Sequence, residues 1–316
     1  MPNNLQIAFF SEAGTKRGLG HLIRSYTIYK ELKEYNFVTA TFYLESDIDF
    51  KKKFPDIIPF SWRNFSLENN YDAVVIDSYE ASLKIYKIIA KNVKTAFYID
   101  DYKRLEYPKG TIINFSPDAH KLYTKENHHR YLLGTKYIPI RNILKEAKKK
   151  TIKKEQLFIM LGGFDTANLS IRITQSLENI PIDKLIVTNR KEDIQELSTI
   201  KNTTVLYKPT DLQLAIAMAE SKLAISTASM TLYELNYLEV PTLILAVAAN
   251  QVYGAQALVS SHLALRAFNG FENNFLQELH HEVFMLLKDK TIQKPPRNVD
   301  GMGTQRIIDT ILELNR

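Results

Sequence analysis

Cysteine is absent from the 316-residue sequence. Its absence excludes disulfide bonds, zinc sites built on thiolates and a cysteine nucleophile, so any catalysis must use other groups. The chain also lacks the run of about 18 apolar residues that a membrane helix needs, and its first ten residues lack the charged and apolar regions of a signal peptide. We therefore expect a cytoplasmic protein with no membrane insertion.

Acidic residues are outnumbered by basic ones, which gives a net charge of +6. Such an excess can serve nucleic acid, anionic lipid or phosphate-bearing ligands. The densest basic run, Lys145 to Lys154, has none of the aromatic or glycine pattern of an RNA-binding module. We interpret it as a solvated linker or helix face and expect no nucleic-acid partner.

Short apolar segments rich in β-branched residues alternate with longer segments of helical period, which is typical of a parallel sheet with crossover helices. The alternation stops at the lysine-rich run and then restarts. It predicts two doubly wound α/β domains, residues 1–145 and 146–316, with ligand crevices at the carboxyl ends of their strands and a site in the cleft between them. The expected strands are 5–10, 38–44, 73–77, 95–100 and 111–115, then 156–161, 184–188, 203–207, 222–226 and 242–246.

The tail after about Phe271 has two more segments with helix-like apolar spacing, 273–290 and 301–315. The last helix is a candidate to pack back across the two domains.

A glycine-rich loop follows the first expected strand and ends at a histidine. Gly14, Gly18 and Gly20 allow a tight turn, and the helix that follows offers unpaired N–H groups to an anion. The spacing fits neither the dinucleotide fingerprint nor a P-loop, so NAD and ATP are weak interpretations. His21 can act as a general base near neutral pH, although a capping or packing histidine is the alternative.

Acidic and aromatic residues follow two further strands. Asp77 to Glu80 stand at the end of one expected strand, and Asp100 and Asp101 stand at the end of the next. Binding residues collect at such positions in this architecture, but aspartate and tyrosine are also common there as turn and cap residues. The neighbouring acids Asp100 and Asp101 are only thin evidence for a metal.

Two loops of the second half have the composition of phosphate sites. Gly162 and Gly163 lie between a strand and a helix, where their backbone N–H groups can bind phosphate, and Ser226 to Thr231 follow another strand. Small hydroxyl residues also cap helices, and Glu234, three residues after Thr231, fits a capping box as well as a ligand contact.

Seven segments occur in the order seen in a known family: GLGHLIR, IDSY, YIDD, GTKYIPIR, LGGFD, ISTASMTLYEL and NQ. With them the chain resembles the UDP-2,4-diacetamido-2,4,6-trideoxy-β-L-altropyranose hydrolases of pseudaminic acid biosynthesis. Those enzymes are similar to MurG-like glycosyltransferases. The ordered set is specific, whereas no single motif is, and the resemblance spans roughly Ile7 to Leu258.

The resemblance implies a GT-B fold and a hydrolysis without metal or cofactor that releases UDP and a free sugar with inversion at the anomeric carbon. His21 matches the histidine that activates water, and Tyr79 matches a tyrosine beside the reacting centre. Glu234, Asn250 and Gln251 match the family's segment around the uridine, ribose and sugar contacts. The loop 226–229 is expected to lie at the pyrophosphate. The other expected substrate-binding residues are Gly18, Gly20, Arg24, Asp101, Arg141, Gly162, Gly163, Ser226, Thr227, Ala228 and Ser229.

The sequence departs from the family pattern at three positions on the sugar side. Phe10 and Glu12 stand where the family usually has arginine and aspartate, and Arg17 replaces an apolar residue. Two alternatives to the hydrolase remain: a MurG-like glycosyltransferase, because the same histidine can activate an acceptor hydroxyl, and a nucleotide-sugar binding protein without chemistry. We expect a UDP-sugar as the partner of a monomer or weak dimer.

Overall fold

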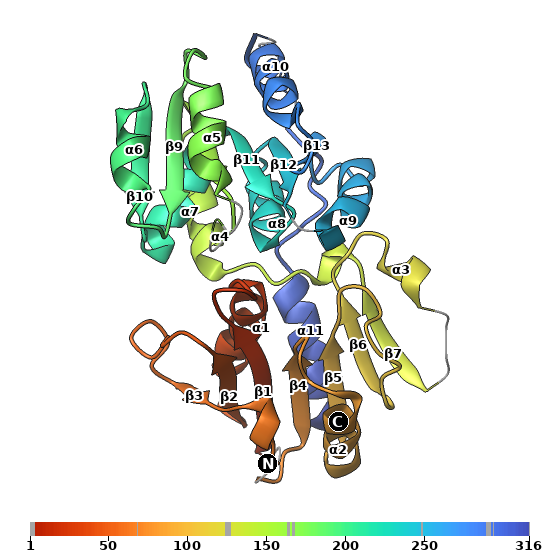
Figure 1. The fold of residues 1–316 in the computed structure, drawn as a ribbon. Coiled ribbons are helices and arrows are strands. Elements are labelled where there is room, and N and C mark those ends of the chain that lie inside the picture. Colours follow the sequence, from red (N-terminus) through yellow and green to blue (C-terminus); the bar gives the residue numbers. More distant parts are fainter. Residues whose placement is uncertain are drawn as a thin grey trace. The chain divides into compact units, whose positions relative to one another are not determined.

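Two compact units make up the chain. The computed structural model describes residues 4–67, 69–123, 128–162, 165, 168–247, 249–288, 292 and 294–315 (Figure 1). Unit 1 comprises Met1–Ile140 with Gly301–Arg316, and unit 2 comprises Arg141–Asp300. The expected division between residues 145 and 146 lies slightly further along the chain than this one. It also placed the last segment in the second domain, whereas contacts place that segment in unit 1.

Unit 1 is built on a parallel sheet in the order β3-β2-β1-β4-β5-β6-β7 (Figure 1). The central strands β1 and β4 are buried along almost their whole length, because helices cover both faces of a doubly wound sheet. The strands are β1 (Leu5–Ala13), β2 (Val38–Ser46), β3 (Ile57–Pro59), β4 (Ala73–Asp77), β5 (Thr95–Ile99), β6 (Gly110–Asn114) and β7 (His129–Leu133).

The helices of unit 1 come from both ends of the chain. They are α1 (Gly20–Leu32), α2 (Leu83–Asn92), α3 (Ala119–Leu122) and α11 (Gly303–Leu312), with short 3₁₀ turns η1 (Trp62–Asn64), η2 (Thr135–Tyr137) and η3 (Glu313–Asn315). Helix α11 contacts α1 and η2 and buries Ile307, Ile308 and Ile311 completely. The Gln305 amide donates to the Tyr35 hydroxyl at 3.0 Å, so the end of the chain completes the core of unit 1.

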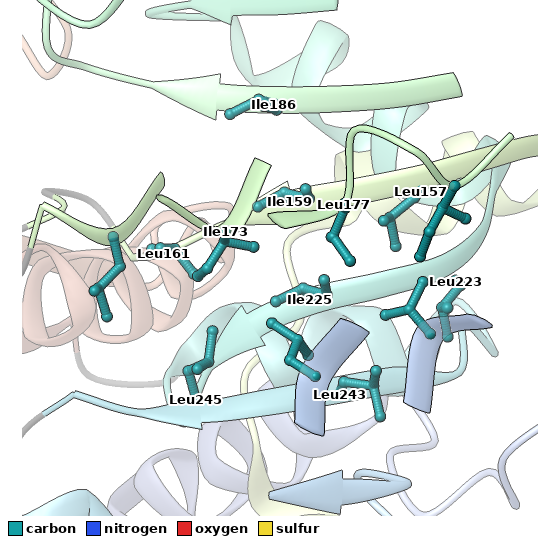
Figure 2. Packing of buried hydrophobic residues seen from close by; sticks show 14 of the residues in the cluster. Leu157, Ile159, Leu161, Ile173, Leu177, Ile186, Leu223, Ile225, Leu243 and Leu245 are labelled. Atoms are coloured by element: carbon teal, nitrogen blue, oxygen red, sulfur yellow. The ribbon is translucent and has the colours of Figure 1, made fainter. Parts of the chain in front are cut away.

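Unit 2 repeats the plan with a sheet in the order β10-β9-β8-β11-β12-β13. Its strands are β8 (Lys154–Met160), β9 (Asp183–Thr188), β10 (Thr203–Tyr207), β11 (Ser221–Thr227), β12 (Thr242–Ala246) and β13 (Arg266–Asn269). Its helices are α4 (Asn142–Lys150), α5 (Leu169–Ser176), α6 (Ile194–Thr199), α7 (Asp211–Glu220), α8 (Met230–Tyr237), α9 (Ala249–Ser260) and α10 (Phe275–Lys288). Figure 2 shows Leu and Ile side chains of β8, β11 and β12 packing with Ile173 and Leu177 in its core.

Each sheet has one place where successive strands diverge to opposite sides. It lies between β1 and β4 in unit 1 and between β8 and β11 in unit 2. Ligands of doubly wound proteins bind beyond the carboxyl ends of the strands at such a point. The two parallel sheets confirm the expected α/β class. None of the helices in the described ranges is long and apolar enough to cross a membrane.

Gly303 permits the close approach of α11 to η2. A Cβ atom at this position would lie 2.2 Å from the carbonyl oxygen of Ile138. We expect Gly303→Ala to lower the free energy of unfolding by about 2 kcal/mol, because backbone atoms must move to relieve the clash.

Gly254 in α9 provides the matched control, because a Cβ there meets nothing within 4 Å. Gly254→Ala should raise the stability by up to about 1 kcal/mol through helix propensity. Urea unfolding followed by circular dichroism measures both variants. Equal stability of the two would contradict the proposed packing of α11.

Candidate active site

The divergence point of unit 1 gathers a cluster of polar side chains. Strands β1 and β4 pair with Ser11 opposite Asp77, so the start of α1 and the residues after β4 lie at one edge of the sheet. The cluster consists of His21, Arg24, Asp77, Tyr79 and Asp101, and we call it the His21 cluster.

A buried carboxylate fixes the imidazole of His21. His21 is the second residue of α1, and its Nδ1 lies 2.6 Å from Oδ1 of Asp77. An ionised carboxylate only accepts hydrogen bonds, so we assign the proton to Nδ1, which leaves Nε2 with a lone pair. Within the described ranges no residue hydrogen-bonds to Nε2. A histidine held in this way has the arrangement of a general base.

Arg24, one helical turn after His21, joins the two aspartates of the cluster. Its Nε and Nη2 each lie 2.7 Å from the Asp77 carboxylate, and Nη1 lies 2.8 Å from Asp101. Nη2 is also 3.1 Å from Nδ1 of His21. The Ser25 hydroxyl donates to Asp77 at 2.8 Å. These bonds occupy both carboxylates, so Arg24 holds the cluster together.

The charges within the cluster shift the pKa values of its members. Burial would raise the pKa of the Asp77 carboxyl, but Arg24 and then His21 outweigh burial and hold the pKa well below its usual range. Burial would also raise the pKa of Asp101, but the charge and hydrogen bonds of Arg24, together with His21, outweigh burial and lower it. Both aspartates are therefore ionised at neutral pH.

Tyr79 contacts the imidazole directly. Its ring stands edge-on to His21, with 4.4 Å between the centroids, and its hydroxyl donates to Asp101. Burial and the charge of Asp101 raise the pKa of Tyr79, so it stays protonated and acts as a donor. The buried Glu12 fixes its backbone, because Oε1 accepts the Tyr79 N–H at 2.8 Å and Oε2 accepts the Ser78 hydroxyl.

The glycine loop before α1 closes on itself. Gly14 and Gly18 exchange backbone hydrogen bonds of 3.1 and 2.8 Å, and Gly18 has a φ of +72°, which side chains disfavour. Asp47 caps the loop by accepting from the Thr15 N–H and hydroxyl. Gly20, the first residue of α1, follows a position whose side chain does not cap the helix.

The divergence point of unit 2 holds two buried serine hydroxyls. Gly162 follows β8 with a φ of +80°, while Gly163 lies outside the described residues. The segment Ser226–Ser229 ends β11 and leads into α8. The hydroxyls of Ser226 and Ser229 are buried, and neither has a hydrogen-bond partner among the residues that the structure describes. Unpaired donors at a helix start suit an anion, because the helix dipole is positive there.

Glu234 does not form the capping box that the sequence allowed. Helix α8 begins at Met230, with Ser229 as its N-cap and no side-chain capping bond. The Glu234 carboxylate instead pairs with Arg141, whose Nε and Nη2 lie at 2.7 and 3.0 Å. Asp211 adds a longer contact of 3.4 Å to Arg141. Two expected binding residues thus neutralise each other in unit 2.

Gln251 in α9 bonds to the chain just before its helix. Its Oε1 accepts the Val247 N–H at 2.9 Å. The side chain of Asn250 lies outside the described part of the structure.

The acids that hinted at a metal have different partners. Asp100 accepts the Tyr123 hydroxyl at 2.7 Å, whereas Asp101 pairs with Arg24. Across the described ranges, no group of three or more acidic or histidine side chains is placed to hold a metal ion.

The roles of two site residues were missed by sequence reasoning. Asp77 was singled out only as one of several polar residues after a strand, and Glu12 only as a departure from a pattern. One signal was available for both, since each acid stands at or near the end of a strand that is mostly apolar. A charge in such a place is buried and needs partners.

Comparisons with known proteins support the motif-based resemblance. No model of a known protein family matches the chain. An uncharacterised protein of Methanocaldococcus jannaschii is 24% identical over 76% of this chain. The pseudaminic acid cytidylyltransferase and UDP-2,4-diacetamido-2,4,6-trideoxy-β-L-altropyranose hydrolase of Helicobacter pylori is 29% identical over 57%. The hydrolase of that name from Campylobacter jejuni is 24% identical over 72%.

These relatives differ in how much of their length the chain covers. It spans 55% and 35% of the first two relatives and 86% of the Campylobacter jejuni hydrolase. The resemblance to curated proteins named as this hydrolase is thus confirmed at modest identity.

Solved structures show the fold. MurG of Acinetobacter baumannii aligns with a TM-score of 0.68 over 98% of this chain and 99% of its own, at 14% identity. UDP-GlcNAc 2-epimerase of Neisseria meningitidis aligns with a TM-score of 0.60 over 98% and 99%, at 12% identity. With two Rossmann-like parallel-sheet units, the chain has the expected GT-B fold.

The aspartates of the His21 cluster make the stability depend on pH. Their pKa values are lower in the folded chain than in the unfolded chain, so they stabilise the fold at neutral pH, and this stabilisation is lost as the pH falls below about 5. We expect Asp77→Asn to cost about 3 kcal/mol at pH 7, because Arg24 and His21 lose a buried partner. It should also lose less stability than the parent between pH 7 and pH 4.

Urea unfolding at the two pH values measures this effect. Asp118→Asn is the control, because Asp118 is half-exposed and forms a surface ion pair with Lys121. If the free energy of unfolding of Asp77→Asn and of the parent depends equally on pH, the Asp77 carboxylate does not contribute to the pH dependence of stability.

Proposed function

We propose that the chain hydrolyses a UDP-linked deoxy-diacetamido sugar to UDP and the free sugar, in the biosynthesis of a nonulosonic acid such as pseudaminic acid. The observation that carries this proposal is the His21–Asp77 pair at the divergence point of unit 1. The names of the Helicobacter pylori and Campylobacter jejuni relatives support the substrate class.

In the proposed reaction His21 Nε2 takes a proton from water as the water oxygen attacks the anomeric carbon. The bond from that carbon to the diphosphate oxygen breaks, UDP leaves with the electron pair, and the anomeric configuration inverts. Asp77 stabilises the imidazolium that forms. The cluster is suited to this step because Arg24, Asp77 and Asp101 together carry one net negative charge.

Tyr79 is proposed to position the base. The Tyr79 ring packs edge-on against the imidazole and restricts its orientation, and Asp101 accepts the hydrogen bond of the Tyr79 hydroxyl. The raised pKa excludes Tyr79 as a second base at neutral pH.

Unit 2 is proposed to bind the UDP moiety. The unpaired hydroxyls of Ser226 and Ser229, with the start of α8, would bind the diphosphate and stabilise the negative charge of the leaving group. Glu234 and Arg141, which pair with each other, and Gln251 stay in the proposal as contacts of the nucleoside.

A glycosyltransferase is the second candidate function. The fold supports this function, because the fold of MurG aligns with this one over almost the whole chain. In that case His21 would deprotonate an acceptor hydroxyl rather than water.

Replacement of His21 tests the base. We expect His21→Gln to lower the rate of hydrolysis by about 10²- to 10⁴-fold, the usual contribution of a positioned base. The enzyme is incubated with UDP-2,4-diacetamido-2,4,6-trideoxy-β-L-altropyranose without an acceptor, and NMR records UDP and the anomer of the free sugar.

His120→Gln is the matched control, because His120 is exposed on α3. Unchanged turnover in His21→Gln would refute the role of His21. If the parent releases UDP only when a sugar acceptor is added, the protein is a glycosyltransferase and not a hydrolase.

The two serines of unit 2 provide a binding test. Ser226→Ala and Ser229→Ala should each weaken UDP binding about 10-fold, measured by calorimetry, because each removes one donor. The variants should be at least as stable as the parent, since neither buried hydroxyl has a partner in the described part of the chain. Ser176→Ala, whose hydroxyl donates to Ile173 within α5, is the control. Unchanged UDP affinity in both variants would show that this loop does not bind the diphosphate.

A further inference from the structure

Two exposed aromatic rings lie next to each other at the His21 cluster. The exposed fraction is 37% for Tyr79 and 49% for Tyr102, and their ring centroids are 5.5 Å apart. Among the exposed aromatic rings of the described ranges, no other two contact each other. Because Tyr79 also contacts the imidazole of His21, Tyr102 lies one ring away from the proposed base. No step of the proposed hydrolysis uses Tyr102.

The backbone around Tyr102 is folded over a buried carboxylate. Tyr102 and Arg104 both donate their backbone N–H groups to Oδ1 of Asp100, at 3.4 and 3.3 Å. Asp100 is buried, and its other oxygen accepts the Tyr123 hydroxyl at 2.7 Å. Lys103, between the two donors, has a φ of +57°, which a tight turn requires and side chains disfavour. The protein therefore fixes the turn that presents the Tyr102 ring, although the ring itself is left exposed.

The charged residues on either side of Tyr102 are engaged by the protein. Asp101 pairs with Arg24 at 2.8 Å, and Lys103 pairs with Glu106 at 3.2 Å. The surface that this turn leaves for a ligand is therefore the ring of Tyr102. An aromatic ring provides a large apolar contact area when a ligand covers it, and aromatic side chains commonly line the sites of small molecules.

We propose that Tyr102 is a specificity-determining residue whose ring, continued by the ring of Tyr79, binds the methyl groups of the sugar. A 2,4-diacetamido-2,4,6-trideoxy sugar carries one methyl group at C6 and one on each acetamido group, whereas an ordinary hexose carries none. With its anomeric carbon at His21, such a sugar extends over Tyr79 toward Tyr102. The inference rests on the proposed function, because the proposed reaction places the sugar beside His21.

Steady-state kinetics of the full-length protein with UDP-2,4-diacetamido-2,4,6-trideoxy-β-L-altropyranose test the role of the ring. Tyr102→Ala should raise KM about 10-fold and keep kcat within about 2-fold of the parent, because an apolar contact made before and during the reaction is lost. Tyr102→Phe keeps the ring, so its KM should stay within about 2-fold of the parent. Phe284→Ala is the matched control, because Phe284 is similarly exposed but lies on α10 of unit 2. An unchanged KM in Tyr102→Ala would overturn the inference.

Saturation-transfer NMR separates a failure of this inference from a failure of the proposed function. The same UDP-sugar is added to His21→Gln, in which turnover is slow, and the aromatic protons of the protein are irradiated. The methyl protons of the sugar should receive saturation, and a second replacement, Tyr102→Ala, should reduce it. If the parent hydrolyses nothing, the proposed function fails and this transfer decides the inference. Methyl protons that receive no saturation, or the same saturation after Tyr102→Ala, would overturn it.

Discussion

The carboxylate of Asp77 is the interaction on which the candidate site depends. It stands at the end of a fully buried strand, where an ionised group is stable only if its oxygens are bound. Three side chains of one helix meet this need, since His21, Arg24 and Ser25 all bond to it from the first turns of α1. The requirement therefore fixes the rotation of α1 on the sheet, and with it the orientation of the imidazole.

Much of the fold follows from the sequence because it is dictated by local patterns. Continuous apolar segments such as 73–77 and 242–246 have to be buried on both faces, so they identify central strands of parallel sheets. The strands β3, β7 and β13 were not predicted. Each lies at the edge of its sheet, is three to five residues long and keeps side chains partly exposed, so its apolar pattern is weak.

The candidate site was predictable only in part, for a different reason. His21 and Tyr79 were found as members of motifs, but the contacts that orient them join residues 22 to 67 positions apart. Such pairings depend on which strands lie side by side, and local periodicity carries no such information. The same limit applies to Glu234, for which a capping box was plausible locally although its partner, Arg141, lies far back in the sequence.

The chain passes between the units twice, because Gly301–Arg316 returns to unit 1 after unit 2 is complete. During synthesis, the residues of α11 leave the ribosome after all of unit 2, so Ile307 and Ile311 are missing from the core of unit 1 until unit 2 has been made. Unit 2 is continuous and has no such delay. Domains usually fold in the order in which they are made. Here the unit that begins first is the one that finishes last, and a nascent chain must protect an unfinished N-terminal core while the later unit closes.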